Sequence, residues 1–508
     1  MYIIIPMSGS GQRFKNDGYR KLKPLIRIGG KPIIQHVVEM FPTDCNFVFI
    51  CRDIHLATTE MRSVLKKVAP SGEILSIPTH KKGPGHAIDL VRTHLEHIKD
   101  EVIVNYCDFS SEFDFQEFIQ NKHKSMSDGI IFTYTGFHPH MLNDGNYAFV
   151  RKEGEIVTDI KEKESYTENK MSEEASSGTY YFSSLKLLYE ALDWTLENDI
   201  NKNGEYYISL FYKYLIKKQK KVSTFLINHM LQWGTPKDLQ EYMQWHNYFA
   251  RDIFDPKIVS VDQLILSMAG AGSRFKNNGY RVSKPFLNVN NKPMWDSARD
   301  CMPSANKTTL ITQKNHMVSP KVCDNIFELD GITNGQATSV YKYVKDVLDY
   351  DSIFVSSVDQ LYEVNPDVLE HHIRRDDSDI IVLTAKNHST ALDTPKMFGW
   401  IRSDNDNLIK EVSVKEVIDK DYIKDSIIIG AFYFRNAKIF KKLYEEQLSR
   451  NITVNGEFYI DSLLQIGLEH KMIIREVQVN RYLSLGTPSN YETYLYWEQY
   501  FSLKSKKC

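Results

Sequence analysis

The stretch Ser8–Pro32, SGSGQRFKNDGYRKLKPLIRIGGKP, decides the fold, because a second version of it stands at Ser267–Pro293, SMAGAGSRFKNNGYRVSKPFLNVNNKP. The two copies share the glycines of the GxG loop, an Arg-Phe-Lys-Asn block, Gly-Tyr-Arg and two Lys-Pro pairs at a constant offset of 270 − 9 = 261 residues. A long match without gaps indicates an internal duplication. The sequence therefore predicts two copies of one domain.

The duplication extends over both halves of the chain. Asn203-Gly-Glu-Tyr-Tyr-Ile returns as Asn455-Gly-Glu-Phe-Tyr-Ile, and Gly234-Thr-Pro returns as Gly486-Thr-Pro. A chain of 508 residues also exceeds the size of one ordinary core. We expect two domains, at residues 1–249 and 261–508, joined by a linker at residues 250–260.

The composition narrows the class of protein. Hydrophobic residues at 42% and charged residues at 25% are typical of a globular protein, and a formal charge of −2 argues against a nucleic-acid polymer as partner. No apolar run approaches the roughly 18 residues of a membrane span, and the N-terminus lacks the basic start of a signal peptide. Six scattered cysteines without metal-type spacing indicate reduced thiols, so we expect a cytoplasmic protein. Whether it forms a homo-oligomer is left open.

The apolar pattern predicts an α/β fold. Tyr2–Ile5 is a continuous apolar run that ends in a glycine loop, as in a strand buried within a parallel sheet. Strands and helices then alternate, which favours two Rossmann-like domains with mixed, mostly parallel sheets and helices on both faces. From residue 130 strands follow one another through turns, so we expect an antiparallel flap at residues 136–163, with a counterpart near residues 398–415.

The glycine loop and two cations predict a phosphate site. Glycines leave backbone N–H groups open to a phosphate. Arg13 follows the last glycine of the loop by two residues and Lys23 follows ten residues later, and the same cations return at Arg274 and Lys284. Permanent cations beside such a loop need an anion to balance their charge. Because both cations recur in the second half, a phosphate-binding role is favoured over the alternative that they are solvated surface residues.

Together, GxGxRF, the following GY and the two KP pairs resemble the NDP-sugar pyrophosphorylases, the nucleotidyltransferases that make activated sugars, and especially the capsule-associated members. The resemblance covers nearly all of each half. It implies the nucleotide-diphospho-sugar transferase fold and, with Mg²⁺, the reaction of an NTP with a sugar 1-phosphate to give an NDP-sugar and pyrophosphate.

The same resemblance assigns roles at the nucleotide. Arg13 and Arg274 would neutralise the leaving pyrophosphate, and Lys23 and Lys284 would stabilise the α-phosphorus. Asp108 and Asp359, at strand ends, would bind magnesium, against a structural alternative in which each aspartate caps a helix. The residues that would hold the nucleotide are Ser8, Gly9, Ser10, Gly11 and Gly85 in the first half and Ala269, Gly270, Ala271, Gly272, Gly335 and Gln336 in the second.

On the acceptor side the two halves differ. The residues implied to bind the acceptor are His138, His140, Glu162, Lys163 and Glu205 in the first half, and Lys415 and Glu457 in the second. Val414 stands where Glu162 is expected. Gln232 and Ser484 stand where the family often has a second metal ligand, which leaves a two-ligand magnesium site in doubt.

These differences would allow the two halves to act on different acceptors, with products for capsule or surface-polysaccharide synthesis. CTP or UTP is favoured by analogy with the family alone. Two alternatives remain. A glycosyltransferase of similar fold would favour a DxD metal motif, which neither Asp108 nor Asp359 belongs to. One half could instead be a non-catalytic nucleotide-binding or scaffold module.

Overall fold

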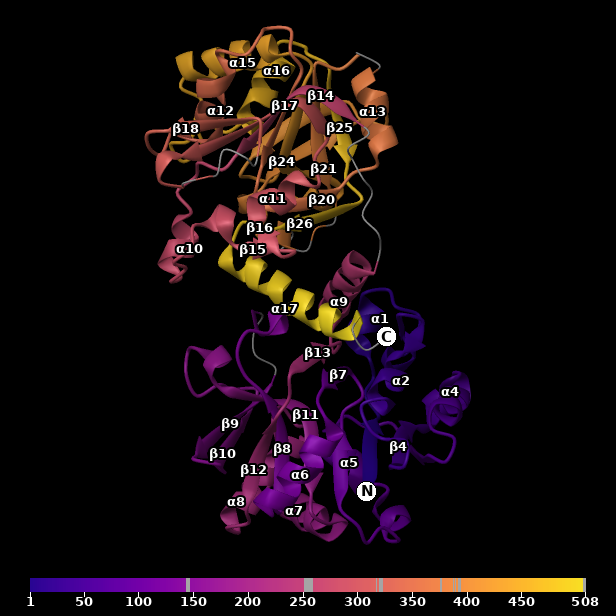
Figure 1. Cartoon of the computed structure of the whole chain (residues 1–508). Helices are drawn as coiled ribbons and strands as arrows, with labels where there is room; N and C mark the ends of the chain where they lie inside the picture. The colour runs from indigo at the N-terminus through magenta and orange to yellow at the C-terminus, as the bar shows by residue number, and fades with distance from the viewer. Residues whose placement is uncertain are drawn as a thin grey trace. The chain divides into compact units, whose positions relative to one another are not determined.

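A computed structural model describes residues 1–142, 147–250, 259–316, 318, 323–374, 377–386, 388, 390–391 and 394–505. The chain forms two compact units, Met1–Phe249 with Tyr496–Cys508, and Ala250–Leu495 (Figure 1). The expected linker at residues 250–260 lies mostly outside the described residues, since 251–258 are not among them.

The first unit is built on a mixed nine-stranded sheet. Its parallel centre has β1 between β4 and β6, with β5 beyond β4, and β11 runs antiparallel between β6 and β8. β12 continues the sheet parallel to β8, while β9 and β10 form a hairpin at the start of β11. The strands are β1 (Tyr2–Met7), β4 (Asn46–Arg52), β5 (Glu73–Ile77), β6 (Val102–Asn105), β8 (Gly129–Tyr134), β9 (Ala148–Glu153), β10 (Ile156–Glu162), β11 (Glu174–Phe182) and β12 (Val222–Leu226).

Helices cover both faces of this sheet. Side chains of a strand point alternately to the two faces, so a strand that is apolar throughout needs a covering layer on each face. Ile131 of β8 belongs to the core with α5 (Gly83–Asp89), α7 (Leu185–Glu197) and α8 (Ile208–Lys217). Its neighbour Phe132 packs instead on Phe118 of α6 (Phe115–Ser125), with ring centroids 4.8 Å apart. The remaining helices of the first unit are α1 (Gln12–Asn16), α2 (Ile33–Val38), α3 (Asp53–Thr58), α4 (Met61–Val68) and α9 (Pro236–Phe249).

A two-stranded ribbon lies outside the main sheet. β7 (Phe109–Glu112), directly after Asp108, pairs antiparallel with β13 (His229–Gln232), which one residue separates from the Gly234-Thr-Pro segment. The ribbon thus brings two segments that are far apart in the sequence to one place. The patterns of the sequence did not reveal either strand, because both are short.

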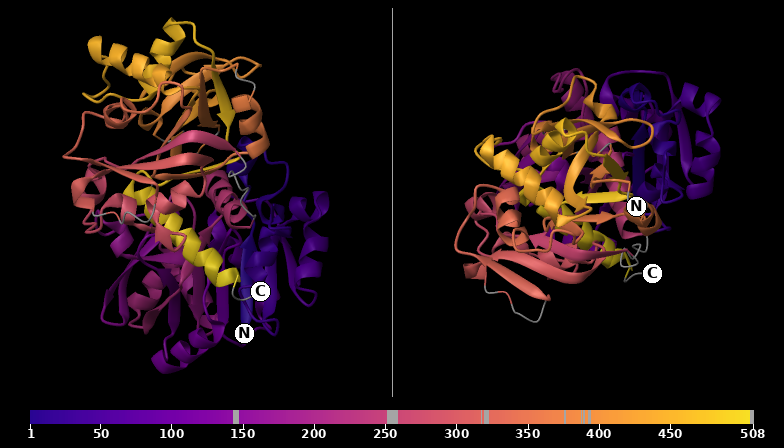
Figure 2. Two further views of the ribbon diagram at one scale, coloured as in Figure 1. Left: turned by 45° about the horizontal axis from the view of Figure 1, so that its top comes forward. Right: turned by 90° about the horizontal axis from the view of Figure 1, so that it is seen from above.

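The second unit repeats this topology, which fits a tandem duplication. Its sheet has the order β18-β17-β14-β19-β24-β21-β25, the same as β5-β4-β1-β6-β11-β8-β12 in the first unit, with β22 and β23 as the flap hairpin. Figure 2 shows the strands and helices of this unit in pink, orange and yellow. The strands are β14 (Ser260–Ser267), β17 (Ser304–Gln313), β18 (Asn325–Leu329), β19 (Ile353–Ser357), β21 (Ile380–Ala385), β22 (Gly399–Ser403), β23 (Ile409–Val414), β24 (Ser426–Phe434) and β25 (Ile474–Gln478), with the ribbon β20 (Gln360–Glu363) and β26 (Arg481–Ser484).

The helices of the second unit occupy matching places in the chain. They are α10 (Ser273–Asn277), α11 (Met294–Arg299), α12 (Gln336–Val344), α13 (Pro366–Arg374), α15 (Ala437–Ser449), α16 (Asp461–Glu469) and the first part of α17 (Pro488–Ser505). The last part of α17 belongs to the first unit, where Tyr496 donates a hydrogen bond to the carbonyl of Met230 at 2.7 Å. The division of the sequence at residues 250–260 assigns all of this helix to the second domain.

The predicted fold class, two Rossmann-like α/β domains with an antiparallel flap, is confirmed. One local prediction differs: the helix expected from Tyr206 begins at Ile208, because Lys202 and Glu205 close a turn in which Asn203 has φ 56°. The described part of the chain contains no helix long and apolar enough to cross a bilayer.

Candidate active site

A cavity of about 1030 Å³ opens at the carboxyl ends of the central strands of the first unit. Met7 ends β1, Arg52 ends β4 and Asp108 follows β6, and all three line it. Crevices at this edge of an α/β sheet are where such folds bind ligands. The predicted site residues that line the cavity are Ser8, Gly9, Ser10, Gly11, Arg13, Lys23, Asp108, His140, Glu162, Lys163 and Glu205.

The glycine loop forms one wall of this cavity. Gly11 has φ 64° and Gly272, its counterpart in the second unit, has φ 60°, a left-handed conformation that strongly favours glycine. A Cβ added at Gly9 or Gly11 would meet nothing within 4 Å. The loop backbone is therefore open on this side, as a phosphate site requires.

A side chain from the second strand of each sheet fixes the start of this loop. The buried Arg52 donates from Nε to the carbonyl of Ser8 and from Nη2 to the carbonyl of His80 at 3.0 Å. In the second unit Gln313 donates to the carbonyl of Ala269 at 2.7 Å. The sequence analysis missed Arg52 and Gln313, although the offset of 313 − 52 = 261 residues equals that of the glycine loops.

A lysine–aspartate ion pair lies beside the loop in both units. Lys23 Nζ is 2.7 Å from Asp108 Oδ2, and Lys284 Nζ is 2.5 Å from Asp359 Oδ2. Burial alone would lower the pKa of Lys23, but the Asp108 carboxylate outweighs it and raises that pKa above its usual value. The predicted α-phosphate cation and the predicted metal ligand are thus direct neighbours.

The Phe and Tyr of the RF–GY segment support this lysine. Phe14 is buried and packs edge-on against Tyr19, with ring centroids 5.2 Å apart, and Lys23 Nζ lies 5.8 Å from the Phe14 ring centre. Phe275 and Lys284 repeat the arrangement at 5.6 Å. Arg13 and Arg274, next to these phenylalanines, stay exposed.

A lysine of the flap faces the loop that precedes α8. Lys163 has φ 57° and its equivalent Lys415 has φ 61°, an unusual backbone conformation for a residue with a Cβ. Lys163 Nζ donates to the Tyr207 hydroxyl at 2.5 Å, and that hydroxyl donates in turn to Glu205. This places the predicted acceptor residues Lys163 and Glu205 together through Tyr207, which the sequence analysis missed.

Glu162 is the buried carboxyl of this wall. Its side chain accepts a hydrogen bond from Ser209 at 2.6 Å, and the residue is 7% exposed. Burial raises the pKa of Glu162 to about 7, against the lowering effect of Ser209 and Lys163. Near neutral pH this carboxyl can therefore both accept and donate a hydrogen bond.

The two histidines of the flap lie in different places. His140 lines the cavity and shares a hydrogen bond with the Tyr134 hydroxyl at 3.0 Å, whereas His138 does not line it. His138 packs among the rings of Tyr134 and Tyr496, with centroids at 4.5 and 5.1 Å. Burial lowers the pKa of His138 to about 4 and that of His140 well below its usual value, so both are neutral at pH 7.

Gly85 lies at the rear of the cavity wall, not in its lining. Its N–H donates to the carbonyl of Tyr206 at 2.9 Å, and a Cβ there would stand 2.8 Å from the same oxygen. Gly335 has the same relation to the loop before α16: a Cβ would stand 2.5 Å from the N and O atoms of Phe458. Both glycines thus allow a helix to approach the Asn-Gly-Glu loop closely.

The second unit brings its predicted residues together in the same way. Lys415 Nζ lies 5.3 Å from the centre of the Tyr459 ring, and Glu457 is a hydrogen-bond partner of Tyr459. Arg274 and Asp359 both lie close enough to influence the charge of Lys415. Lys415, Glu457, Arg274 and the Lys284–Asp359 pair therefore form one site.

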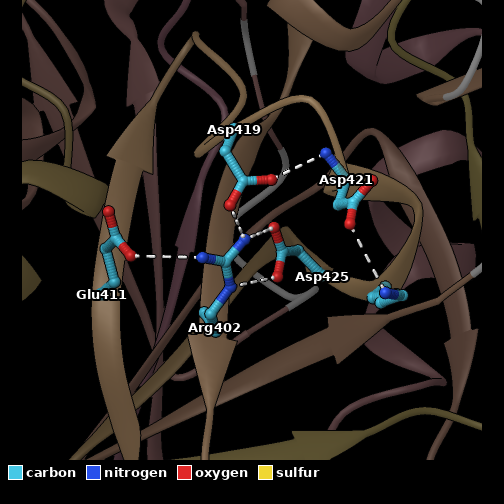
Figure 3. Close-up of polar contacts among 6 residues, drawn as sticks. Arg402, Glu411, Asp419, Asp421 and Asp425 are labelled. Atoms are coloured by element: carbon cyan, nitrogen blue, oxygen red, sulfur yellow. Dashed lines mark hydrogen bonds and ion pairs between the residues drawn. The ribbon is translucent and has the colours of Figure 1, made fainter.

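Outside this site, the flap of the second unit carries a network of charges around Arg402 (Figure 3). Its guanidinium donates to Asp425 from Nε and Nη2, both at 2.8 Å, and to Asp419 at 2.8 Å. Glu411 lies 3.6 Å away. The network ties β22 to the segment before β24, so it holds the flap together.

The polar side chains near each strand-end aspartate fit a magnesium ion that takes most of its ligands from substrate and water. A Cβ on Gly234 would lie 3.4 Å from Gln232 Nε2 and 3.5 Å from Asp108 Oδ2, and one on Gly486 would lie 3.4 Å from Ser484 Oγ and 3.5 Å from Asp359 Oδ2. Each aspartate thus has a neutral polar side chain near it, an amide in the first unit and a hydroxyl in the second, and the oxygens of both groups suit magnesium. Among the described residues, no group of three or more His, Cys, Asp and Glu could hold a metal.

The first unit is an α/β domain with an open glycine loop and cationic side chains at the edge of its central strands. The family model for nucleotidyl transferases matches residues 3–246, which lie in the first unit, so this unit resembles a nucleotidyl transferase domain. Two curated relatives are bifunctional GlmU proteins. The one from Clostridioides difficile strain 630 is 28% identical over 232 residues, which are 44% of this chain and 46% of the relative. The one from Methanocaldococcus jannaschii is 26% identical over 247 residues, which are 47% of this chain and 53% of the relative. The chain thus matches about half the length of these relatives.

Among solved structures, the nucleoside-diphosphate-sugar pyrophosphorylase of Vibrio cholerae RC9 is 22% identical, with a TM-score of 0.41. The match covers 47% of this chain and 99% of that one.

Proposed function

We propose that the chain is a nucleotidyltransferase that joins a nucleotidyl group to a phosphorylated sugar, polyol or related small acceptor and releases pyrophosphate. The observation that carries the proposal is the Lys–Asp pair beside an open glycine loop, present in both units. A cation beside the loop would offset the negative charge that accumulates as the α-phosphorus reacts. The surface-polysaccharide role and a CTP or UTP substrate rest on the family resemblance.

The reaction needs alignment and charge neutralisation more than proton transfer. An oxygen of the acceptor phosphate attacks the α-phosphorus, and the bond from the α-phosphorus to the oxygen that bridges it to the β-phosphate breaks, so pyrophosphate leaves with that oxygen. Lys23 stabilises the α-phosphate and Arg13 the leaving group, while Lys163 holds the acceptor phosphate. In the second half Lys284, Arg274 and Lys415 take these roles.

Asp108 with Gln232, and Asp359 with Ser484, would hold Mg²⁺. When bound, the ion supplies positive charge that offsets the charge of the phosphate oxygens. Asp108 and Asp359 would be free to bind the ion once the phosphates of the nucleotide pair with Lys23 and Lys284 in their place.

The test is pyrophosphate release from four NTPs with sugar, polyol and amino-acid-derived phosphates. We expect Lys23→Ala and Lys284→Ala each to lower the activity of one half by about 10²–10³-fold, the typical loss when one transition-state donor is removed. Lys21→Ala and Lys292→Ala are matched controls, because these lysines are about half-exposed and pair with surface acids. Absence of turnover with every pair of substrates would refute the proposal.

The same variants decide whether one half is a non-catalytic module. Activity of the whole chain that is unchanged by Lys284→Ala for every substrate pair would favour a binding or scaffold role for the second half. Transfer of sugar from an NDP-sugar, in place of pyrophosphate release, would favour the glycosyltransferase alternative.

A further inference from the structure

The two units line their acceptor walls with different side chains at one pair of positions. In the first unit Glu162 of β10 is opposite Ala148 of β9, and Ser209 of α8 hydrogen-bonds to its carboxyl. In the second unit the same register places Val414 opposite Gly399. The flap strand of the second unit therefore supplies an apolar side chain where the first has a carboxyl.

A carboxyl nevertheless reaches this wall of the second unit from another element. The segment Asn203-Gly-Glu-Tyr-Tyr-Ile-Ser aligns with Asn455-Gly-Glu-Phe-Tyr-Ile-Asp, so Asp461 of α16 takes the place of Ser209. Its Oδ2 occupies the space that a Cβ on residue 399 would need, which explains why Gly399 stands where the first unit has Ala148. The positions of Glu162 and Ser209 in the first unit are thus occupied by Val414 and Asp461 in the second.

Asp461 also belongs to the charge cluster of the second site. It is the acid with the largest influence on the charge of Lys415, and Lys415 also lies near Arg274, Asp359 and Glu457. A half-buried carboxyl against the flap, beside the lysine of the acceptor wall, corresponds in chemistry to Glu162 beside Lys163. Both units therefore have a carboxyl at this wall. It comes from strand β10 in the first unit and from helix α16 in the second.

We propose that Asp461 is the carboxyl that binds a hydroxyl group of the second half's acceptor, a phosphorylated sugar or polyol whose phosphate lies at Lys415. This inference rests on the proposed function of the second half. A carboxyl that enters from the helix, on a side chain one methylene shorter than glutamate, places its oxygens differently from Glu162. The two halves therefore select different acceptors.

The competing explanation is structural, since an acid in the first turn of a helix stabilises that helix. Such a role would change the stability of the second unit and would leave the KM of the acceptor unchanged. Asp367 of α13 is an exposed first-turn acid in the same unit, so Asp367→Asn is the matched control.

The experiment uses the full chain with Lys23→Ala, so that pyrophosphate release reports the second half. We expect Asp461→Asn to raise the KM of the acceptor by about 10–100-fold, the loss of one hydrogen bond to a charged group, with the KM of the NTP unchanged. Asp461→Ser with Val414→Glu rebuilds the wall of the first half and should shift the acceptor preference toward that of the Lys284→Ala chain. An acceptor KM unchanged by Asp461→Asn, or a KM of the NTP raised equally, overturns the inference.

A different result would mark failure of the proposed function itself. If the Lys23→Ala chain releases no pyrophosphate with any pair of substrates, the second half is not a nucleotidyltransferase for that panel. The acceptor site is then tested by thermal unfolding with glucose 1-phosphate and glycerol 3-phosphate as probes. Stabilisation that is lost in Asp461→Asn and kept in Asp367→Asn supports the site, and no stabilisation by either probe overturns it.

Discussion

Replacing Glu162 by glutamine should stabilise the first unit in a pH-dependent way. The pKa of this carboxyl rises from 4.5 to about 7 in the folded protein, chiefly because the side chain is buried. At about 1.36 kcal/mol per pKa unit, ionised Glu162 destabilises the fold by about 3 kcal/mol. The amide of the Glu162→Gln variant keeps an oxygen for the Ser209 hydroxyl but cannot ionise, so the substitution removes this penalty.

The sign of the effect follows from the direction of the pKa shift. Below pH 4.5 Glu162 is protonated in both the folded and the unfolded chain, so the variant gains nothing. As the pH rises toward about 7 the unfolded chain loses its proton first, so the wild-type protein loses stability. The advantage of Glu162→Gln should therefore grow from pH 4.5 to 7 and then stay constant.

Thermal unfolding measured at pH 4.5 and pH 8 tests this reasoning. A unit of this size shifts its Tm by roughly 2 °C per kcal/mol, so we expect a gain of about 6 °C at pH 8 and almost none at pH 4.5. Glu155→Gln, at an exposed position of the same flap, is the control and should show no such trend. A Tm difference for Glu162→Gln that is the same at both pH values would refute the argument from burial.

Four further predictions address the site and the fold. If Glu162 accepts a hydrogen bond from the acceptor, the KM of the first half's acceptor should fall as the pH rises through about 7, and initial rates of Glu162→Gln should lack this trend. Gly335→Ala should destabilise the second unit by about 1–3 kcal/mol in urea unfolding, because its Cβ would overlap Phe458 at φ 111°, while Gly331→Ala, with nothing within 4 Å, should be close to neutral. Arg402→Met should lower the Tm of the second unit by leaving the buried Asp425 without its partner, whereas Lys424→Met, in an exposed pair, should not. Chelation of Mg²⁺ should abolish pyrophosphate release, and Gln232→Ala should raise the Mg²⁺ concentration needed by the first half; normal rates in excess chelator would contradict the donor set.

The sequence by itself determined the class of fold and predicted the phosphate site. The recurrence of Gly11, Arg13 and Lys23 as Gly272, Arg274 and Lys284 required no coordinates, because a glycine at a left-handed turn and cations beside it are local features of the chain. The buried strand Tyr2–Met7 was equally evident, since a continuous apolar run is typical of the centre of a parallel sheet.

Only the tertiary structure decided which of these groups meet. Lys23 and Asp108 are 85 residues apart and pair because β1 and β6 are neighbours in the sheet. His138 and His140 are two residues apart, yet one lies in an aromatic cluster and the other in the cavity lining, because the short 3₁₀ turn that begins at Pro139 separates them. From the sequence alone, Val414 indicates only that the second unit lacks the glutamate of the first. In the fold, Val414 of β23 is opposite Gly399 of β22, and Asp461 of α16 lies against Gly399. The second unit therefore has a carboxyl at this wall that comes from a helix.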